Sequence, residues 1–247
     1  MTRFRLWLEY DGRPFVGWQR QANGPSVQAA LERACEALEG RAVQVQGAGR
    51  TDTGVHASRQ CAHIDLKKPL AAGKVADALN AHLRPDPVAV LNAEAMPDSF
   101  HARFSATARH YRYVIINRRA PLTVDRGLAW RVPAALDAGA MHTAAGHLTG
   151  RHDFSTFRDA QCQADSPLRT LDTIAVSRHQ DRIEITCSAR AFLHRQVRSM
   201  VGSLVEVGRG RRSPAWIAEI LAAADRTRCG PVAPPDGLYL TGVDYPS

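Results

Sequence analysis

The sequence predicts an α+β fold made of two successive β-α-β-β-α-β halves, the order of ferredoxin-like and RNA-recognition folds. Three observations predict it. The spacing of apolar residues alternates along the chain between the period of a strand and that of a helix. The order of elements begins again near residue 105, and the 247 residues suffice for one large domain or two small ones. We predict halves at residues 1–105 and 106–247, repeated in architecture but not in sequence.

The first half begins with alternating apolar residues over residues 3–10, which predict a strand. After a loop with Gly and Pro, Ser26 is placed to cap a helix that Gly40 ends. The elements expected next are a short strand over residues 42–46, a strand over 61–66, a helix over 74–83 and a strand over 88–95. A glycine-rich loop separates the first two of these strands.

The second half follows a connector, residues 96–108, that has no clear periodicity. Its expected elements are a strand over 109–117, a helix over 136–148, a polar segment over 151–169, a hairpin of 171–178 and 182–188, two helices, and a last strand over 238–243. Of the two helices after the hairpin, the first carries apolar residues between Val197 and Val205 and ends at Gly208. Ser213 and Pro214 are placed to start the second.

The charge of the chain favours a polyanionic partner. The formal net charge is +8, and arginine supplies 29 of the 32 cations. Its planar guanidinium binds phosphates and stacks on bases, which suits nucleic acid. A genome-wide preference for arginine over lysine explains the ratio, but it does not explain the excess of positive charge.

Several classes of protein are disfavoured. No apolar run approaches the roughly 20 residues of a membrane span, and the N-terminus does not form a signal-peptide core, so we expect a cytoplasmic protein with no membrane partner. Five cysteines without a C-x-x-C pair argue against a disulfide framework and a structural zinc site. His56, Cys61 and His63 lie close in sequence, but their spacing matches no common metal pattern, so we predict no metal.

Residues 47–57, GAGRTDTGVHA, contain three glycines around one cation, one carboxylate and two hydroxyls. A tight loop that holds Asp52 beside Arg50 suits chemistry on an anionic substrate, although a polar surface turn has the same composition. Asp52 also begins the Asp-Thr-Gly string of aspartic proteases. Those enzymes need two such aspartates, and this chain has no second Asp-Thr-Gly or Asp-Ser-Gly, which argues against a protease.

The loop resembles the catalytic GRTDxGVHA string of the tRNA pseudouridine synthase A family, with Thr53 where the family usually has Ala. Residues 189–210, ARAFLHRQVRSMVGSLVEVGRG, resemble its FLHxMVRxxVG segment, with Arg195 and Gln196 where His and Met are more usual. Further matches are EYDGRPFVGWQRQ, SFHARFSAT, GRHDFSTFR and GLYLTGVDY. The resemblance runs in family order from residue 9 to residue 245, and it implies a pseudouridine-synthase-type fold with a central basic cleft.

The resemblance implies an RNA-modifying isomerase that converts uridines 38, 39 and 40 of the tRNA anticodon stem and loop to pseudouridine. The reaction breaks the bond from ribose C1′ to N1, turns the base, and joins C1′ to C5. No atoms are gained or lost, so we expect no cofactor. The target base must leave the RNA stack to reach a pocket. The resemblance also implies a homodimer in which one tRNA contacts both subunits.

The resemblance implies that Asp52 is the essential catalytic residue. Three roles fit its carboxylate: attack on C1′, attack on the base, or abstraction of a sugar proton. Arg198 matches the family Arg that pairs with this Asp, although an arginine on an amphipathic helix is more often simply solvated. Tyr111, the first Tyr of a Tyr-x-Tyr strand, is expected to stack on the uracil, with core packing as the alternative, and Tyr113 is assigned to the core.

Arg50 has two readings of equal weight: it occupies the space left by the flipped base, or it contacts a phosphate. The runner-up function is a non-catalytic RNA-binding protein that keeps the fold. Such a protein would have no use for the carboxylate of Asp52, which phosphates repel. The site prediction is therefore Asp52 and Arg198 as catalytic residues, with Tyr111 and Arg50 binding substrate.

Overall fold

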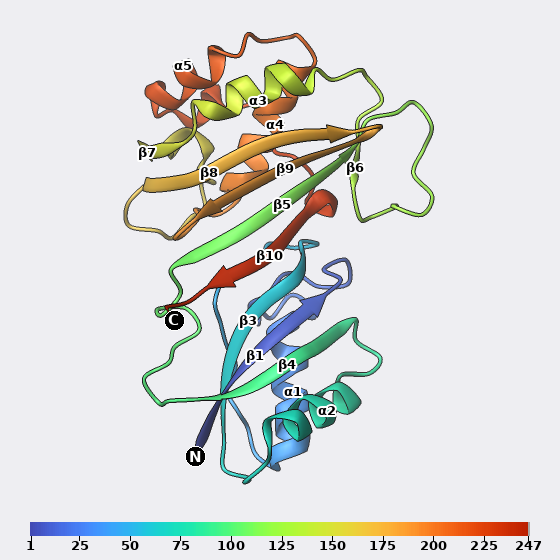
Figure 1. Cartoon of the computed structure of the whole chain (residues 1–247), viewed down its shortest axis with the longest axis vertical. Helices are drawn as coiled ribbons and strands as arrows, with labels where there is room; N and C mark the ends of the chain where they lie inside the picture. Colours follow the sequence, from blue (N-terminus) through green and yellow to red (C-terminus); the bar gives the residue numbers. More distant parts are fainter. Residues whose placement is uncertain (247) are drawn as a thin grey trace. The chain divides into compact units, whose positions relative to one another are not determined.

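The computed structural model describes residues 1–246 of the chain (Figure 1). The chain forms two compact units: unit 1 is Met1–Arg109 with Tyr239–Ser247, and unit 2 is His110–Leu238. The sequence prediction divided the chain between residues 105 and 106, and it placed the last strand, residues 238–243, in the second half. The structure instead assigns the last strand to unit 1. Apolar alternation identifies a strand but does not name its partner, which is why the sequence could not show this.

Unit 1 contains a sheet in the order β4-β1-β3-β10 and two helices. Its elements are β1 (Thr2–Tyr10), α1 (Val27–Glu39), β2 (Gln46–Gly47), β3 (His56–Leu66), α2 (Ala72–Leu83), β4 (Val88–Met96) and β10 (Leu238–Asp244). β1 is antiparallel to both β3 and β4, and β10 runs parallel to β3. Helices α1 and α2 pack against each other, and α2 packs on β4 (Figure 1).

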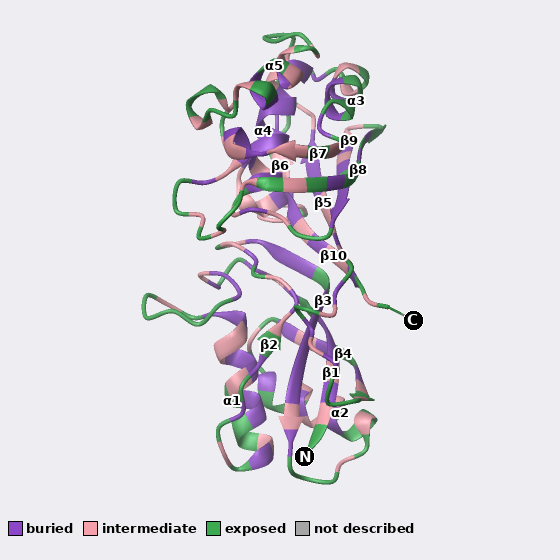
Figure 2. Ribbon diagram, turned by 90° about the vertical axis from the view of Figure 1, so that its left-hand side faces the viewer, coloured by how far each residue is buried: buried purple, intermediate pink, exposed green. Residues whose placement is uncertain are grey.

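The predicted elements of unit 1 form for the expected reasons. Alternate side chains of β1 enter the core, with Phe4, Leu6 and Leu8 at most 1% exposed. The Ser26 hydroxyl caps α1 by accepting a hydrogen bond from the Ala29 N–H at 3.2 Å. Two strand boundaries differ from prediction by more than two residues. Only Gln46–Gly47 pair as β2, and β3 begins five residues earlier than expected, at His56, so the glycine-rich loop leads directly into it. Most of β3 is buried (Figure 2).

Unit 2 has a sheet in the order β5-β9-β8-β7, with β6 paired to β5. Its elements are β5 (Ala108–Ile116), β6 (Trp130–Arg131), α3 (Ala138–Gly146), β7 (Gly150–Asp153), η1 (Ser155–Phe157), β8 (Leu168–His179), β9 (Arg182–Ala189), α4 (Gln196–Gly208), α5 (Trp216–Ala223), η2 (Arg226–Arg228) and η3 (Pro235–Gly237). The predicted hairpin is confirmed as antiparallel β8 and β9. The polar segment over residues 151–169 contains β7 and η1, anchored by the fully buried Phe154 and Phe157. The α+β class is confirmed.

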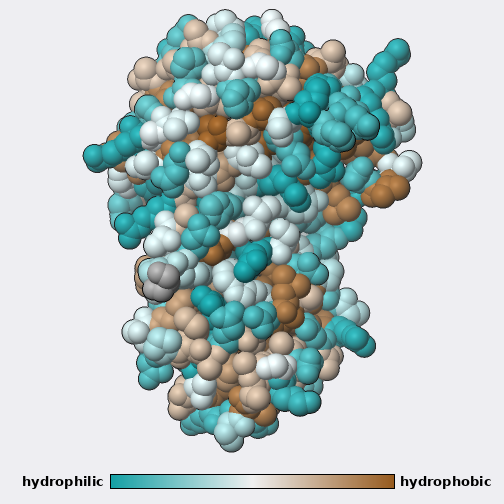
Figure 3. All heavy atoms as spheres, in the orientation of Figure 1, coloured by the Kyte–Doolittle hydropathy of each residue, from teal (hydrophilic) through white to brown (hydrophobic). Residues whose placement is uncertain are grey.

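The drawn surface of the protein is mostly hydrophilic. On the face drawn in Figure 3, hydrophilic residues predominate and hydrophobic ones form smaller patches. None of the helices within residues 1–246 is long and apolar enough to cross a membrane.

Candidate functional site

The glycine-rich loop of unit 1 carries Asp52 on a tight turn between β2 and β3. The Val55 N–H donates to the Asp52 carbonyl at 3.1 Å, which closes the turn. Asp52 is half-buried, whereas Arg50 is exposed to solvent. The loop therefore presents a partly desolvated carboxylate close in sequence to a solvated cation, on a backbone that hydrogen bonds keep in place.

The N-terminal segment that follows β1 holds this loop from one side. The Trp18 N–H donates to the Thr51 carbonyl at 3.0 Å. The Thr53 hydroxyl donates to the Val16 carbonyl at 2.9 Å. Both residues that flank Asp52 in sequence are thus hydrogen-bonded to the same segment, so the stretch EYDGRPFVGWQRQ supports the glycine-rich loop.

Two residues that the sequence analysis did not select support Thr51. Gly17 has φ +119°, and a Cβ there would lie 2.7 Å from the Thr51 carbonyl oxygen, so only glycine allows the approach. The buried Tyr10 hydroxyl lies 2.8 Å from the Thr51 hydroxyl, and burial raises the pKa of Tyr10 to about 12. The sequence did offer one sign of this support, because Gly17 lies within the matched stretch EYDGRPFVGWQRQ. It did not indicate that Thr51 is the residue that Gly17 approaches.

The start of the loop is held by a buried arginine. Arg109 is 8% exposed, and its Nη2 donates to the Ala48 carbonyl at 2.8 Å and to the Arg103 carbonyl at 2.7 Å. The Gln60 amide donates to the Gly49 carbonyl at 3.0 Å. Arg109 was predicted only as the first residue of a strand. Its guanidinium instead serves main-chain carbonyls, which keeps a buried charge solvated by dipoles.

Two of the three residues weighed as metal ligands, His56 and His63, make other contacts. His56 is 1% exposed, stacks on Tyr239 with ring centroids 4.8 Å apart, and accepts the Gly12 N–H on Nδ1 at 3.1 Å. His63 accepts the Ala102 N–H on Nδ1, and burial lowers the pKa of His63 to about 4. Nowhere in residues 1–246 do three or more His, Cys, Asp or Glu side chains gather in a way that could hold a metal.

In unit 2, β5 carries both tyrosines of the Tyr-x-Tyr strand. Tyr113 is fully buried and donates its hydroxyl to the Pro234 carbonyl at 2.7 Å, so its assignment to the core is confirmed. Tyr111 is half-buried, and its ring meets the Phe192 ring edge-on, with centroids 5.1 Å apart at 85°. Tyr111 is thus oriented by the first residue of the FLHRQVR segment.

Arg198 lies in the first turn of α4, half-buried. Its Nε donates to the Ala233 carbonyl at 2.8 Å, and the Ala233 N–H donates to the Arg198 carbonyl at 3.1 Å. The segment around Ala233 approaches α4 so closely that a Cβ on Gly202 would lie 1.6 Å from the Pro231 carbonyl oxygen. Burial raises the pKa of Tyr113, and the positive charge of Arg198 partly opposes this rise.

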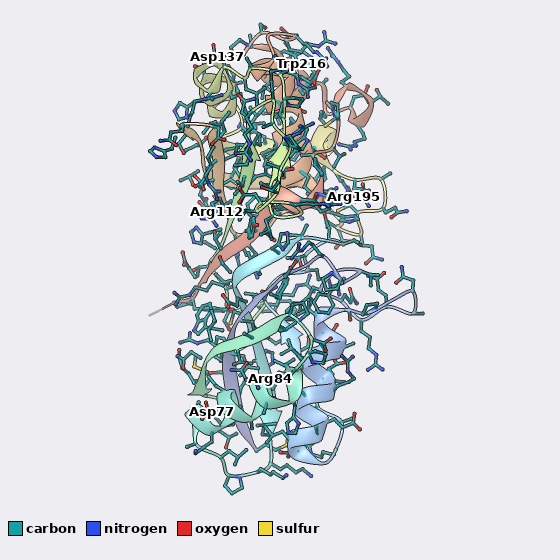
Figure 4. The ribbon with its side chains drawn as sticks, turned by 90° about the vertical axis from the view of Figure 1, so that its right-hand side faces the viewer. Asp77, Arg84, Arg112, Asp137, Arg195 and Trp216 are labelled. Atoms are coloured by element: carbon teal, nitrogen blue, oxygen red, sulfur yellow. The ribbon has the colours of Figure 1, made fainter. Side chains whose placement is uncertain are left out.

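Arg195, which stands where the family usually has His, forms an ion pair with Asp159. Arg195, labelled in Figure 4, precedes α4 with φ +57°. Its Nη1 donates to the Asp159 carboxylate at 2.9 Å. The Asp159 N–H donates to the His194 carbonyl at 3.2 Å. Burial raises the pKa of Asp159, but the Gln161 N–H together with Arg195 and His194 outweighs burial, so the net pKa lies below the ordinary value. Asp159 was not selected from the sequence.

The four predicted site residues divide evenly between the units. Asp52 and Arg50 share the loop of unit 1, and Tyr111 and Arg198 lie on β5 and α4 of unit 2. A half-buried carboxylate can act as nucleophile or base, a half-buried tyrosine can stack on a base, and arginines can bind phosphate or hold a carboxylate ionised.

Comparisons with known proteins agree with this chemistry. The sequence model of a family described as tRNA pseudouridine synthase matches residues 7–105 and 144–246. A tRNA pseudouridine synthase A of Maricaulis maris is 66% identical over 246 residues, covering 100% of this chain and 99% of that protein. Proteins of the same name from Hyphomonas neptunium and Parvibaculum lavamentivorans are 62% and 59% identical, with 99–100% of each chain covered. The chain belongs to the tRNA pseudouridine synthase family, whose members convert uridine to pseudouridine in tRNA.

Proposed function

We propose that this enzyme modifies uridines 38, 39 and 40 in the anticodon stem and loop of tRNA, with Asp52 as its essential residue. The observation that carries the proposal is the half-buried Asp52 carboxylate, on a loop that hydrogen bonds hold from both flanking residues. Partial desolvation of a carboxylate costs stability, and a surface that only binds RNA would bind it better without a negative charge.

The reaction is an isomerisation. The C1′–N1 bond breaks, the uracil turns within the pocket, and C1′ bonds to C5. The C5 proton then leaves and N1 takes up one proton, which restores the uracil ring with no net gain or loss of atoms. Asp52 initiates it by attack on C1′, by attack on the base, or by removal of a sugar proton. The balance of atoms requires no cofactor and no metal.

The other three residues serve the flipped nucleotide. Tyr111 stacks on the uracil, and its edge-on contact with Phe192 supports this role because it fixes the ring plane. Arg198 holds Asp52 ionised, as its counterpart does in the family that the sequence resembles. Arg50, exposed on the loop, contacts the RNA at the vacated position or at a phosphate.

The setting of the reaction follows from the family resemblance and from charge. We propose that the enzyme acts in the cytoplasm as a homodimer, with one tRNA touching both subunits. The net charge of +8 supports binding of a polyanion of this size.

Turnover distinguishes this enzyme from a binding protein that keeps the fold. Sub-stoichiometric protein is incubated with excess unmodified tRNA, and pseudouridine is mapped by position. The enzyme should convert many equivalents at positions 38–40, whereas Asp52→Asn should lose turnover by at least about 10²-fold. Its tRNA affinity should change little, because phosphate contacts dominate binding.

Asp77→Asn is the matched control, since Asp77 is an exposed carboxylate on α2 of the same unit (Figure 4). It should retain wild-type turnover. Retention of a tenth of wild-type turnover by Asp52→Asn would exclude Asp52 as the essential residue. Conversion limited to one equivalent or less would favour the RNA-binding alternative.

A further inference from the structure

The connector that leaves β4 contains a turn, residues 101–105, that none of the proposed catalytic roles uses. Its Phe104 side chain is 71% exposed. A single exposed apolar residue is common on protein surfaces and carries no meaning by itself. The residues around Phe104 indicate that it has a specific role.

The turn is held by hydrogen bonds along its whole length. The Ser105 N–H donates to the His101 carbonyl at 2.9 Å, and the His101 N–H donates to the Ser105 hydroxyl at 3.0 Å. His101 Nδ1 accepts the N–H groups of Arg103 at 3.1 Å and of Phe104 at 3.3 Å. Burial, with the charges of Arg3 and Arg103, lowers the pKa of His101, which keeps Nδ1 an acceptor. Phe104 is therefore displayed on an ordered backbone.

The side chains of this turn form an aromatic and cationic platform. The rings of His101 and Phe104 have centroids 4.4 Å apart at 36°, and the Arg103 guanidinium carbon lies 5.5 Å from the Phe104 centroid. Arg103 is exposed, and no carboxylate within residues 1–246 forms an ion pair with it. An exposed aromatic face beside an uncompensated arginine is the combination that binds unstacked bases and their phosphates.

The platform is coupled to the catalytic loop through one buried side chain. Arg109 Nη2 donates to the Arg103 carbonyl at 2.7 Å and to the Ala48 carbonyl at 2.8 Å. A single guanidinium therefore fixes the turn and the start of the glycine-rich loop within unit 1. RNA bound at the turn would be held at a defined position relative to Asp52.

We propose that the turn of residues 101–105 is a tRNA contact, in which the Phe104 ring stacks on an unpaired nucleobase and Arg103 binds an adjacent phosphate. This proposal rests on the proposed function only for the identity of the RNA as tRNA. A protein partner of the same turn is the competing occupant. The uncompensated positive charge and the polyanionic substrate of the family favour RNA.

The test measures the dissociation constant for unmodified tRNA in an Asp52→Asn background, so that binding is separated from turnover. Phe104→Ala should weaken binding about tenfold, and Phe104→Trp should stay within about threefold of the parent, because stacking needs a ring and tolerates a larger one. Arg103→Ala should make the slope of log affinity against log salt shallower by about 0.7–0.9.

Leu91→Ala is the matched control, since Leu91 is a 50% exposed apolar residue on β4 with no cationic platform. Its affinity should equal that of the parent. Equal affinity of Phe104→Ala and Leu91→Ala would overturn the proposal. So would a change in oligomeric state of Phe104→Ala by sedimentation with unchanged affinity per protomer, which would assign the turn to a protein contact. If the wild type makes no pseudouridine but Phe104→Ala still weakens RNA binding, the proposed function fails and this contact stands.

Discussion

Asp52 and Arg198, the two proposed catalytic charges, are held in different ways. Asp52 lies on a loop whose backbone is bonded through its neighbours, Thr51 and Thr53, to the segment after β1. Arg198 lies on a helix, and its own side chain donates to the Ala233 carbonyl. The loop fixes the backbone from which the short Asp52 side chain extends. For Arg198, the Ala233 carbonyl fixes the far end of the long side chain.

This difference follows from side-chain length. An aspartate has two side-chain torsions, so a fixed backbone already defines the position of its carboxylate closely. An arginine has four, and ordering them costs up to about 2 kcal/mol of side-chain entropy. A hydrogen bond from the guanidinium to a fixed acceptor offsets this cost. We therefore expect the Asp52 site to be sensitive to changes in its backbone supports, and the Arg198 site to changes in the chemistry of the guanidinium itself.

Replacing Arg198 should produce the largest effect. If Arg198 keeps Asp52 ionised, Arg198→Ala should lower the single-turnover rate at neutral pH by about 10²-fold. It should also move the acid limb of the pH–rate profile upward, because a neighbouring cation lowers an aspartate pKa by about 1–3 units. Arg198→Lys should recover part of the rate, since lysine keeps a charge but lacks the Nε that binds Ala233.

Arg211→Ala serves as the control, because it removes an exposed cation from the same unit without touching α4's first turn. Its profile should overlay that of the wild type. An Arg198→Ala enzyme with an unshifted profile and weaker tRNA binding would show that Arg198 is an RNA contact and not the partner of Asp52.

A change to the backbone support of the loop should have an intermediate effect. Gly17→Ala combines a positive φ with a Cβ only 2.7 Å from the Thr51 carbonyl oxygen, so the loop must shift. Gly40→Ala meets a positive φ of +81° but nothing within 4 Å. Both should lose about 1–2 kcal/mol of unfolding free energy from backbone strain, with the larger loss at Gly17. Only Gly17→Ala should lower the single-turnover rate, by about tenfold or more.

Urea unfolding and single-turnover kinetics at saturating tRNA separate the two contributions. Equal rates for Gly17→Ala and Gly40→Ala would mean that the support of Thr51 does not position Asp52.

The sequence predicted the local elements and the charged site residues, but not the residues that support them. Periodicity located most strands and helices, and the motifs selected Asp52 and Arg198 because both lie within strings of several matching residues. The supports Tyr10, Arg109 and Asp159 act over 41, 61 and 36 positions in sequence. Neither composition nor spacing encodes such pairings, which arise only when the sheet and the helices bring the segments together. The parallel pairing of β10 with β3 escaped prediction for the same reason.

The smallest effect is expected at Asp159, which offers α4 a second anchor besides Ala233. Its pKa is below the ordinary value in the folded protein, so its carboxylate stabilises the fold above its unfolded pKa of about 3.9. That contribution should disappear as the pH falls through the lowered folded-state value. Asp159→Asn should therefore lose about 1 kcal/mol of unfolding free energy at pH 7, discounted because Arg195 is 41% exposed, and the difference from wild type should vanish in acid.

Turnover of Asp159→Asn should stay within about threefold of wild type, because Arg198 keeps its bond to Ala233 whatever happens at Arg195. Adding Arg195→Gly should recover part of the lost stability, since φ +57° strains an arginine and not a glycine. The measurement is urea unfolding between pH 3 and pH 7 for the wild type, the single variant and the double variant. A stability difference that does not shrink between pH 7 and pH 3 would mean that the charge of Asp159 is not what anchors the start of α4. A large loss of turnover at full stability would mean that Asp159, and not Ala233 alone, positions Arg198.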